Sequence, residues 1–475
     1  MQIKIALPKG RLLDETTALL KMAGWELGGY HSKARLYRLR SRKFHNLLAK
    51  IFQEKDIPIQ VAVGNYDLGI CGLDWVEELL VKYPSSALVK VKNLEYGRGI
   101  LNVVASRSGR AITADGLPAR QGVTRIASEY PNLAESFAAK NRLRRFSVFP
   151  LCGAAEVYPP ESADLALISG MTEAELLSYG LTLVSNVLSF RALLIANRDS
   201  WETKDMSGIL ASLEDKLPSV QEEVAGVATR LSTEAGISVG AQFEEAEDIV
   251  RLALPDGHQQ LPTLELFNKA GIQVDDYQSA MGNRRPTSNL EGVTIKVIRP
   301  QDMPLQVAND NFDLAISGRD WLIEHLYQFP SSPVTEFLDL KSGRVRIVAV
   351  VSKDLPADDV SSLRQISAER PVSFRVASEY VNIADKYARD NHLGMYRVVP
   401  TWGATEAFLP EDADLLIENT ETGQTIARHN LKIIDNLFTS TACLIGNRSD
   451  IPSARKRQRI EYIVEILRTA VEAIQ

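Results

Sequence analysis

The chain of 475 residues repeats itself once along its length. Ala6-Leu7-Pro8 returns 247 positions later as Ala253-Leu254-Pro255, and Ala127-Ser128-Glu129-Tyr130 returns 250 positions later as Ala377-Ser378-Glu379-Tyr380. The repeat unit is several times longer than that of a solenoid, so the sequence predicts two tandem copies of a whole module. We expect the modules to span residues 1–235 and 248–475. Their join is expected near 232–247, which is polar and contains glycines.

Each copy alternates short apolar runs with helical patterns. Ile3–Leu7, Ile59–Val63 and Leu68–Cys71 are expected as strands, and Leu12–Met22 and Trp75–Val81 as helices. This alternation is typical of an α/β fold with largely parallel sheets. In such sheets ligands bind beyond the carboxyl ends of the strands, where most of the repeated motifs fall.

Composition and charge exclude several classes of protein. A net charge of −6 gives no basic field for nucleic acid. The start has no apolar signal-peptide region, and no apolar run is long enough to span a membrane. The three cysteines are too few and too far apart for a disulfide framework or a zinc site. A cytoplasmic protein that binds neither nucleic acid nor membrane is therefore expected.

The stretch ENTETGQT, residues 418–425, stands between an expected strand and an expected helix. Gly423 permits a backbone turn with positive φ, and the amides of Gly423, Gln424 and Thr425 would open a helix N-terminus that suits a phosphate. Thr422 and Thr425 add hydroxyl donors. Glu418 and Glu421 suit ribose hydroxyls or Mg²⁺ rather than phosphate. A sugar phosphate fits this combination, and a plain helix cap remains the alternative.

Taken together, the motifs resemble the ATP phosphoribosyltransferase family, which carries out the first step of histidine biosynthesis. The matching segments cover both halves of the chain: LPKGRL from Leu7, DLGICGLDW from Asp67, RIASEYPNL from Arg125, LCGAAEVYP from Leu151 and ENTETGQTI from Glu418.

The resemblance implies a fold. Each module would have two α/β lobes similar to type II periplasmic binding proteins, with the site between them. Lobe I is expected at about 1–95 with 170–235, and lobe II at about 96–169. In the second module we expect lobe I at about 248–341 with 418–475, and lobe II at about 342–417.

The resemblance also implies a reaction. N1 of ATP would attack C1 of phosphoribosyl pyrophosphate (PRPP) in the presence of Mg²⁺, with release of pyrophosphate. Such chemistry needs positioning and charge neutralisation more than acid–base groups. We therefore expect Arg299, Lys9 and Arg11 to be catalytic. Substrate binding is expected from Arg35, Asp320, Glu406 and the 418–425 loop, and no protein ligands for a metal are assigned.

The two copies differ in complementary ways. In the first copy Glu173 stands in place of Gly423 and Glu175 in place of Thr425, so carboxylates replace a phosphate loop. In the second copy Asp256 and His258 replace Lys9 and Arg11 of the opening loop. The second copy alone has an arginine, Arg299, in the segment VIRPQDMP, where the first has Gln53, and the resemblance implies that this arginine helps neutralise pyrophosphate.

Two explanations of these losses remain open. The modules could pair as an intrachain pseudo-dimer, with one composite site that uses the second copy's loop and basic residues of the first. Alternatively, the second copy is catalytic alone and the first is a scaffold or regulatory relic. Short members of the family are dimers whose subunits exchange arginines, and they use a regulatory subunit similar to histidyl-tRNA synthetase. By resemblance, a homo-oligomer and such a subunit are expected partners here, and no histidine-binding C-terminal domain is expected.

Two other functions compete with catalysis. One is a non-catalytic regulatory paralogue of the same fold, which the degenerate first loop favours and the intact second loop opposes. The other is a two-lobed small-molecule binding protein, which would leave the phosphate loop unexplained.

Overall fold

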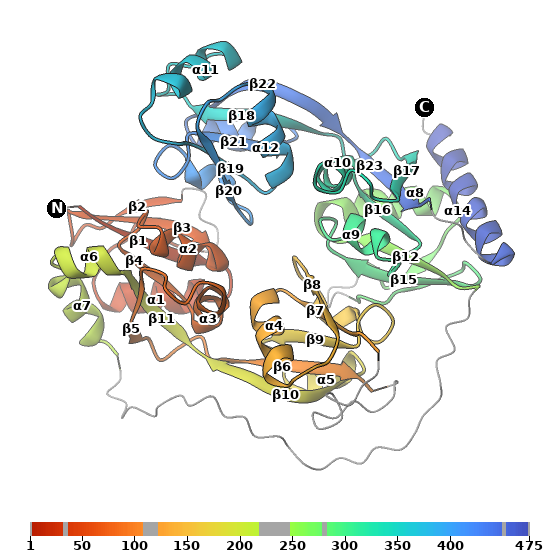
Figure 1. Cartoon of the computed structure of the whole chain (residues 1–475), viewed down its shortest axis with the longest axis horizontal. Helices are drawn as coiled ribbons and strands as arrows, with labels where there is room; N and C mark the ends of the chain where they lie inside the picture. The colour runs from red at the N-terminus through yellow and green to blue at the C-terminus, as the bar shows by residue number, and fades with distance from the viewer. Residues whose placement is uncertain are drawn as a thin grey trace.

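The computed structural model describes residues 2–31, 37–107, 122–217, 248–277, 283–448 and 453–473. It folds into four α/β lobes, which we number 1 to 4 (Figure 1). The expected join at 232–247 lies outside the described residues. No helix in the described part of the chain combines the length and apolar character needed to cross a membrane.

Lobe 1 contains a six-stranded sheet in the order β2-β3-β1-β4-β11-β5. β1 pairs parallel with β3 and β4, whereas β11 pairs antiparallel with β4 and β5. Its elements are β1 (Ile3–Lys9), α1 (Leu13–Met22), β2 (Arg38–Arg40), β3 (Leu47–Gln53), η1 (Glu54–Asp56), α2 (Ile57–Ala62), β4 (Leu68–Gly72), α3 (Leu73–Lys82), β5 (Leu88–Asn93), β11 (Ala192–Asn197), α6 (Arg198–Thr203) and α7 (Ser207–Glu214).

Lobe 2 contains a five-stranded sheet in the order β10-β6-β9-β7-β8. The chain enters it through β6 and leaves it through β10, and these two strands pair antiparallel. Its elements are β6 (Gly99–Ser106), β7 (Thr124–Ser128), α4 (Pro131–Lys140), β8 (Phe146–Pro150), η3 (Ala155–Val157), β9 (Leu165–Ser169), α5 (Glu173–Ser178) and β10 (Leu181–Phe190).

Lobe 3 repeats lobe 1, with a main sheet in the order β15-β12-β16-β23-β17 and a small β13-β14 pair. Its elements are β12 (Val250–Pro255), η4 (Gly257–Gln259), α8 (Gln260–Lys269), β13 (Val274–Asp275), β14 (Thr287–Ser288), β15 (Val293–Ile298), α9 (Met303–Ala308), β16 (Leu314–Gly318), α10 (Arg319–Gln328), β17 (Val334–Asp339), β23 (Ala442–Asn447) and α14 (Ala454–Glu472).

Lobe 4 repeats lobe 2, with its sheet in the order β20-β19-β21-β18-β22. Its elements are β18 (Val345–Ser352), α11 (Val360–Glu369), β19 (Phe374–Ser378), α12 (Val381–Asp390), β20 (Tyr396–Pro400), η5 (Thr405–Phe408), β21 (Leu415–Thr420), α13 (Gln424–Arg428) and β22 (Leu431–Ser440).

These sheets correct three expectations. The boundaries placed at 170 and 418 are wrong, because β10, β21 and β22 hydrogen-bond into the sheets of lobes 2 and 4. The sheets are mixed rather than largely parallel, because the strands that carry the chain between lobes pair antiparallel. Residues 59–63 do not form a strand: α2 covers Ile57–Ala62, with Pro58 in its first turn and Ile57 and Val61 packed over Gly69.

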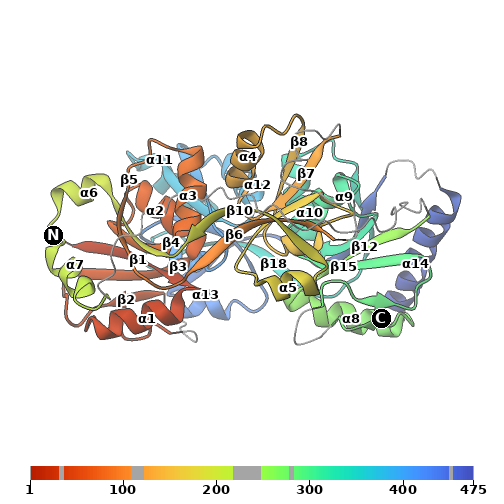
Figure 2. The same cartoon turned by 90° about the horizontal axis from the view of Figure 1, so that it is seen from below.

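Each lobe packs against a lobe of the other module. One apolar core joins lobes 1 and 4 and includes Phe52 and Ile57 with Phe408 and Leu416. A second core joins lobes 2 and 3 in the same way, through residues such as Tyr158 and Phe312. Figures 1 and 2 show the resulting arrangement, with lobe 4 beside lobe 1 and lobe 2 beside lobe 3. The two modules therefore form an intrachain pseudo-dimer with continuous hydrophobic interfaces.

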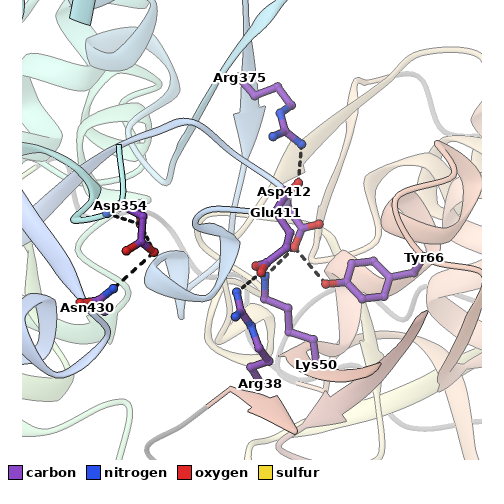
Figure 3. A network of polar contacts seen from close by, with 9 residues as sticks. Arg38, Lys50, Tyr66, Asp354, Arg375, Glu411, Asp412 and Asn430 are labelled. Atoms are coloured by element: carbon purple, nitrogen blue, oxygen red, sulfur yellow. Dashed lines mark hydrogen bonds and ion pairs between the residues drawn. The ribbon is translucent and has the colours of Figure 1, made fainter. Parts of the chain in front are cut away.

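A buried polar network reinforces the interface between lobes 1 and 4 (Figure 3). The ammonium group of Lys50 lies 2.7 Å from Asp412 and 3.3 Å from Glu411. The Tyr66 hydroxyl donates to Asp412 at 3.0 Å, and Arg38 pairs with Glu411. Burial lowers the pKa of Lys50, while Asp412 opposes that shift. These groups fix the placement of lobe 4 on lobe 1, because an unpaired charge at this site would be costly.

Candidate active site

A cavity of about 350 Å³ between lobes 3 and 4 contains the predicted phosphate loop. His258 of lobe 3 lines one side of it, and the other side comes from lobe 4. The predicted residues that line it are Glu406, Glu418, Glu421, Thr422, Gln424 and Thr425. Glu421, Thr422, Gln424 and Thr425 are exposed, so a ligand can reach them.

The loop has the geometry that its sequence predicts. It follows β21, and Gly423 adopts φ 75° as the residue that precedes α13. The amide of Gly423 donates to Thr420 Oγ1 at 2.9 Å. No side chain caps α13. The Gln424 amide donates to Thr422 Oγ1 at 3.4 Å. The partners of these two amides are therefore threonine hydroxyls and not carboxylates, so the helix end carries no internal anion.

In the corresponding loop of the first module, the Glu175 side chain accepts hydrogen bonds from the start of the helix. Thr172 caps α5, and the Glu175 carboxylate accepts from the Thr172 amide at 2.7 Å and from its hydroxyl at 2.8 Å. These hydrogen bonds lower the pKa of Glu175. An internal anion thus occupies the amide and hydroxyl of Thr172, the counterpart of Thr422, and its charge opposes a second anion.

Carboxylates behind the phosphate loop carry perturbed pKa values. Burial raises the pKa of Glu418 to about 8, with Glu379 and Glu406 adding repulsion. The pKa of Glu379 is itself raised by burial, and Lys55 only partly offsets this shift. Such a cluster is stabilised by any ligand that brings a cation or hydroxyl donors into the cavity.

The two basic residues of the opening loop have different surroundings. Arg11 is held by carboxylates of its own lobe, at 2.5 Å from Glu54 and 3.1 Å from Asp74. Lys9 forms no salt bridge among the described residues, and its ammonium lies 3.3 Å from the Tyr37 hydroxyl. Lys9 is consequently the cation of this loop that is available to a ligand.

A larger cavity of about 590 Å³ lies where the four lobes meet. Lys9 and Arg11 of lobe 1 line it, together with Glu129 of lobe 2, Arg299 of lobe 3 and Trp402 of lobe 4. The backbone of Gly153 in lobe 2 approaches Arg299 so closely that a Cβ there would lie 2.9 Å from Nε. Arg299 also pairs with Asp256 at 3.0 Å.

Arg299 lies beside lobe 2 of the first module, and its role in neutralising pyrophosphate stays a prediction. The segment before α9 crosses the pseudo-dimer interface, so it faces lobe 2 of the other module. The equivalent residue that faces lobe 4 is Gln53, since a Cβ on Gly403 would lie 3.3 Å from its Nε2. A neutral amide therefore lies beside lobe 4, and the arginine lies beside lobe 2.

The chain matches one family model twice. The model described as "HisG: ATP phosphoribosyltransferase" covers residues 53–218 and 299–469, one segment in each half. The ATP phosphoribosyltransferase of Chlorobaculum parvum is 31% identical over 236 residues, which are 49% of this chain and 74% of the relative. That of Chlorobium phaeovibrioides is 32% identical over 231 residues, or 47% of this chain and 72% of the relative.

This chain belongs to the ATP phosphoribosyltransferase family. The two matched segments confirm the tandem duplication. Family membership supports an enzyme of this class and does not favour the regulatory or binding-protein alternatives.

Solved structures also resemble the chain, at lower similarity. The ATP phosphoribosyltransferase HisG:HisZ complex from Thermotoga maritima matches with 22% identity and a TM-score of 0.38, over 45% of this chain and 98% of that one. The periplasmic aliphatic sulphonate binding protein SsuA from Escherichia coli matches with 15% identity and a TM-score of 0.30, over 45% of this chain and 68% of that one. Family membership rests on the sequence matches.

The ATP phosphoribosyltransferase motifs also predict that Asp320 and Arg35 bind substrate. Asp320 is 4% exposed and accepts from Tyr380 at 2.5 Å and Ser440 at 2.9 Å, so it joins lobe 3 to lobe 4. Arg35 lies outside the described residues.

Sequence reasoning missed two aromatic residues near the intact ATP phosphoribosyltransferase loop. Tyr37 of lobe 1 stacks on His429 of lobe 4, with ring centroids 5.3 Å apart and an angle of 18° between the planes. Tyr37 stands two positions after Arg35 in SKARLYRLR, and His429 ends α13. Only the packing of lobe 4 on lobe 1 brings them together, so no local pattern in the sequence could identify the pair.

Proposed function

We propose that this protein transfers the phosphoribosyl group of PRPP to N1 of ATP, with release of pyrophosphate, at one composite site per chain. The observation that carries the proposal is the difference between the two helix ends: α13 has no capping side chain, whereas α5 is capped by Thr172, whose amide and hydroxyl donate to the Glu175 carboxylate. The phosphate of PRPP would bind the amides and hydroxyls of residues 422–425. Glu418 and Glu406 would accept hydrogen bonds from the ribose hydroxyls.

The first module would contribute charge to this site. Lys9 shares a cavity with Thr401 and Trp402 of lobe 4 and has a phenol as its polar partner. It can therefore neutralise charge that develops on the departing pyrophosphate. Arg11 and Arg299 are already paired with carboxylates, so they are weaker candidates for this role.

Mg²⁺ fits this site as a partner of the substrate. The described residues contain no cluster of three or more His, Cys, Asp or Glu side chains that would hold a metal alone. Mg²⁺ commonly uses one or two carboxylates together with substrate oxygens, and Glu406 and Glu418 line the same wall of the cavity. When bound, the ion would supply charge neutralisation to the pyrophosphate.

The proposal includes a cytoplasmic location. It also includes assembly into a homo-oligomer and a regulatory subunit similar to histidyl-tRNA synthetase. The oligomer and the regulatory subunit rest on the family resemblance, and the location rests on the composition of the chain.

The direct test is an assay with purified protein, ATP, PRPP and Mg²⁺, in which phosphoribosyl-ATP and pyrophosphate are measured together. Equal amounts of both products are expected. A protein that binds PRPP but forms neither product would contradict the proposed reaction.

A further inference from the structure

Tyr37 occupies a point where the two modules meet beside the intact loop. Its backbone carbonyl accepts from the Ile51 amide at 2.8 Å, which fixes Tyr37 to β3 of lobe 1. Its ring stacks on the imidazole of His429 in lobe 4. His429 ends α13, and its amide bonds back to Thr425 and Ile426 of the phosphate loop helix. One side chain of the first module thus contacts the helix that carries the second module's loop.

The Tyr37 hydroxyl connects two charged groups of the site. It lies 3.3 Å from the ammonium group of Lys9, which also lies 5.2 Å from the ring centroid. The carboxylate of Glu406 is close enough to this hydroxyl to raise its pKa. Burial raises the pKa of Tyr37 to about 12, with Glu406 and Glu418 adding to the shift, so the phenol stays protonated at neutral pH. A neutral hydroxyl can therefore accept from Lys9 while it lies close to Glu406.

The equivalent place in the other half is built differently. By position, Arg284 replaces Tyr37, Asp256 replaces Lys9 and Tyr179 replaces His429. Arg284 pairs with Asp256 at 2.7 Å and lies 3.9 Å from Glu156, the counterpart of Glu406. Arg284 therefore neutralises the carboxylates beside it. Beside the intact loop, in contrast, a phenol separates an available lysine from an acid.

We infer that Tyr37 is a positioning residue which, from the first module, holds Lys9, Glu406 and the α13 loop in register for PRPP in the second module. The inference rests on the proposed function and adds to it the specific contact that makes the second site depend on the first module. Aromatic stacking sets the distance between the modules at the loop, and the hydroxyl sets the direction of Lys9.

Tyr37→Phe and Tyr37→Ala separate these two contributions. Tyr37→Phe removes one hydrogen bond and should raise the KM for PRPP about 5- to 10-fold with kcat within about twofold. Tyr37→Ala also removes the stacking and should raise KM further, to about 50-fold.

Tyr66→Phe is the matched control, because it removes the same group from the same interface at a point away from the loop. It should lower the melting temperature and leave KM unchanged. Arg284→Ala should leave KM for PRPP unchanged as well.

The outcomes are distinct. If both Tyr37 variants keep the wild-type KM, or if they only lower the melting temperature as Tyr66→Phe does, the inference is wrong. If the wild-type protein itself shows no turnover, the proposed function fails and PRPP binding measured by calorimetry decides about Tyr37. Weaker binding in Tyr37→Phe would then support the positioning role, and equal binding would overturn it.

Discussion

The two modules differ most clearly at the loop that follows β9 in lobe 2 and β21 in lobe 4. In lobe 4 the loop turns at Gly423 and leaves the end of α13 uncapped. In lobe 2 the loop turns at Gly170, and Glu175 bonds to the Thr172 amide. The two copies therefore differ both in where the backbone turns and in whether a carboxylate lies on the helix start. We expect only the loop of lobe 4 to hold a phosphate.

The largest expected effect comes from making the intact loop resemble the degenerate one. Gly423→Glu places a carboxylate at the loop and forces a non-glycine residue into φ 75°. Repulsion of the phosphate and backbone strain together should lower kcat/KM by roughly 10²- to 10³-fold. Steady-state kinetics checks this. Glu173→Gly is the matched control and should stay within about twofold of the wild type.

The two interfaces between the modules also differ in their polar contacts. Asp412 pairs with buried Lys50 between lobes 1 and 4, and its counterpart between lobes 2 and 3 is Ser162. Asp412→Ala should cost about 3 kcal/mol of unfolding free energy, because Lys50 would keep only Glu411 as a partner. Ser162→Ala should cost less than about 1 kcal/mol, since its hydroxyl has no hydrogen-bond partner among the described residues. Urea denaturation measures both, and equal losses would show that the two interfaces do not differ as described.

A smaller effect tests whether the first module serves the second. Lys9→Ala should lower kcat/KM by about 10- to 100-fold without loss of thermal stability, because an available cation near the site is removed. Arg11→Ala should instead act mainly on stability, since Arg11 neutralises Glu54 and Asp74. Wild-type turnover in Lys9→Ala would mean that the second module is catalytic alone.

The pH dependence of stability gives the smallest effect and has opposite signs for the two loops. Glu418 has its pKa raised from 4.5 to about 8, so the folded protein keeps a proton that the unfolded chain releases. Its contribution to stability therefore falls as pH rises from about 4.5 to 8. Glu418→Gln should become progressively more stable than the wild type across that window and level off above it.

Glu175 supplies the opposite case. Its pKa is lowered, so its contribution is present above its ordinary value and is lost as pH falls below it. Thermal unfolding of Glu418→Gln and Glu175→Gln between pH 3 and 9 tests both signs. Parallel curves for the two variants would contradict the difference between the loops.

The repeats and the loop residues could be predicted from the sequence, because they are visible in short stretches of it. The spacing of the repeats gave two modules, and Gly423 against Glu173 predicted unequal loops. The segment Ile59–Val63 misled because a short apolar run suits both a strand and a buried helix, and Pro58 at the helix start decided between them.

The remainder depends on contacts between distant segments. Lobe 4 packs on lobe 1 through Phe52, Phe408 and the Lys50 network, and no periodicity in the sequence encodes that choice. The same packing turns Arg299 toward lobe 2 and brings Tyr37 to His429. Residue types at the site were thus predictable, whereas the module that each one serves was not.

The central claim is that only the second module binds PRPP, and equilibrium calorimetry with Mg²⁺ and PRPP tests it most directly. The account predicts one PRPP per chain in the wild type and in Glu173→Gly, and none in Gly423→Glu. Two PRPP molecules per chain, or binding that survives Gly423→Glu and is lost on altering the loop at Thr172, would contradict it.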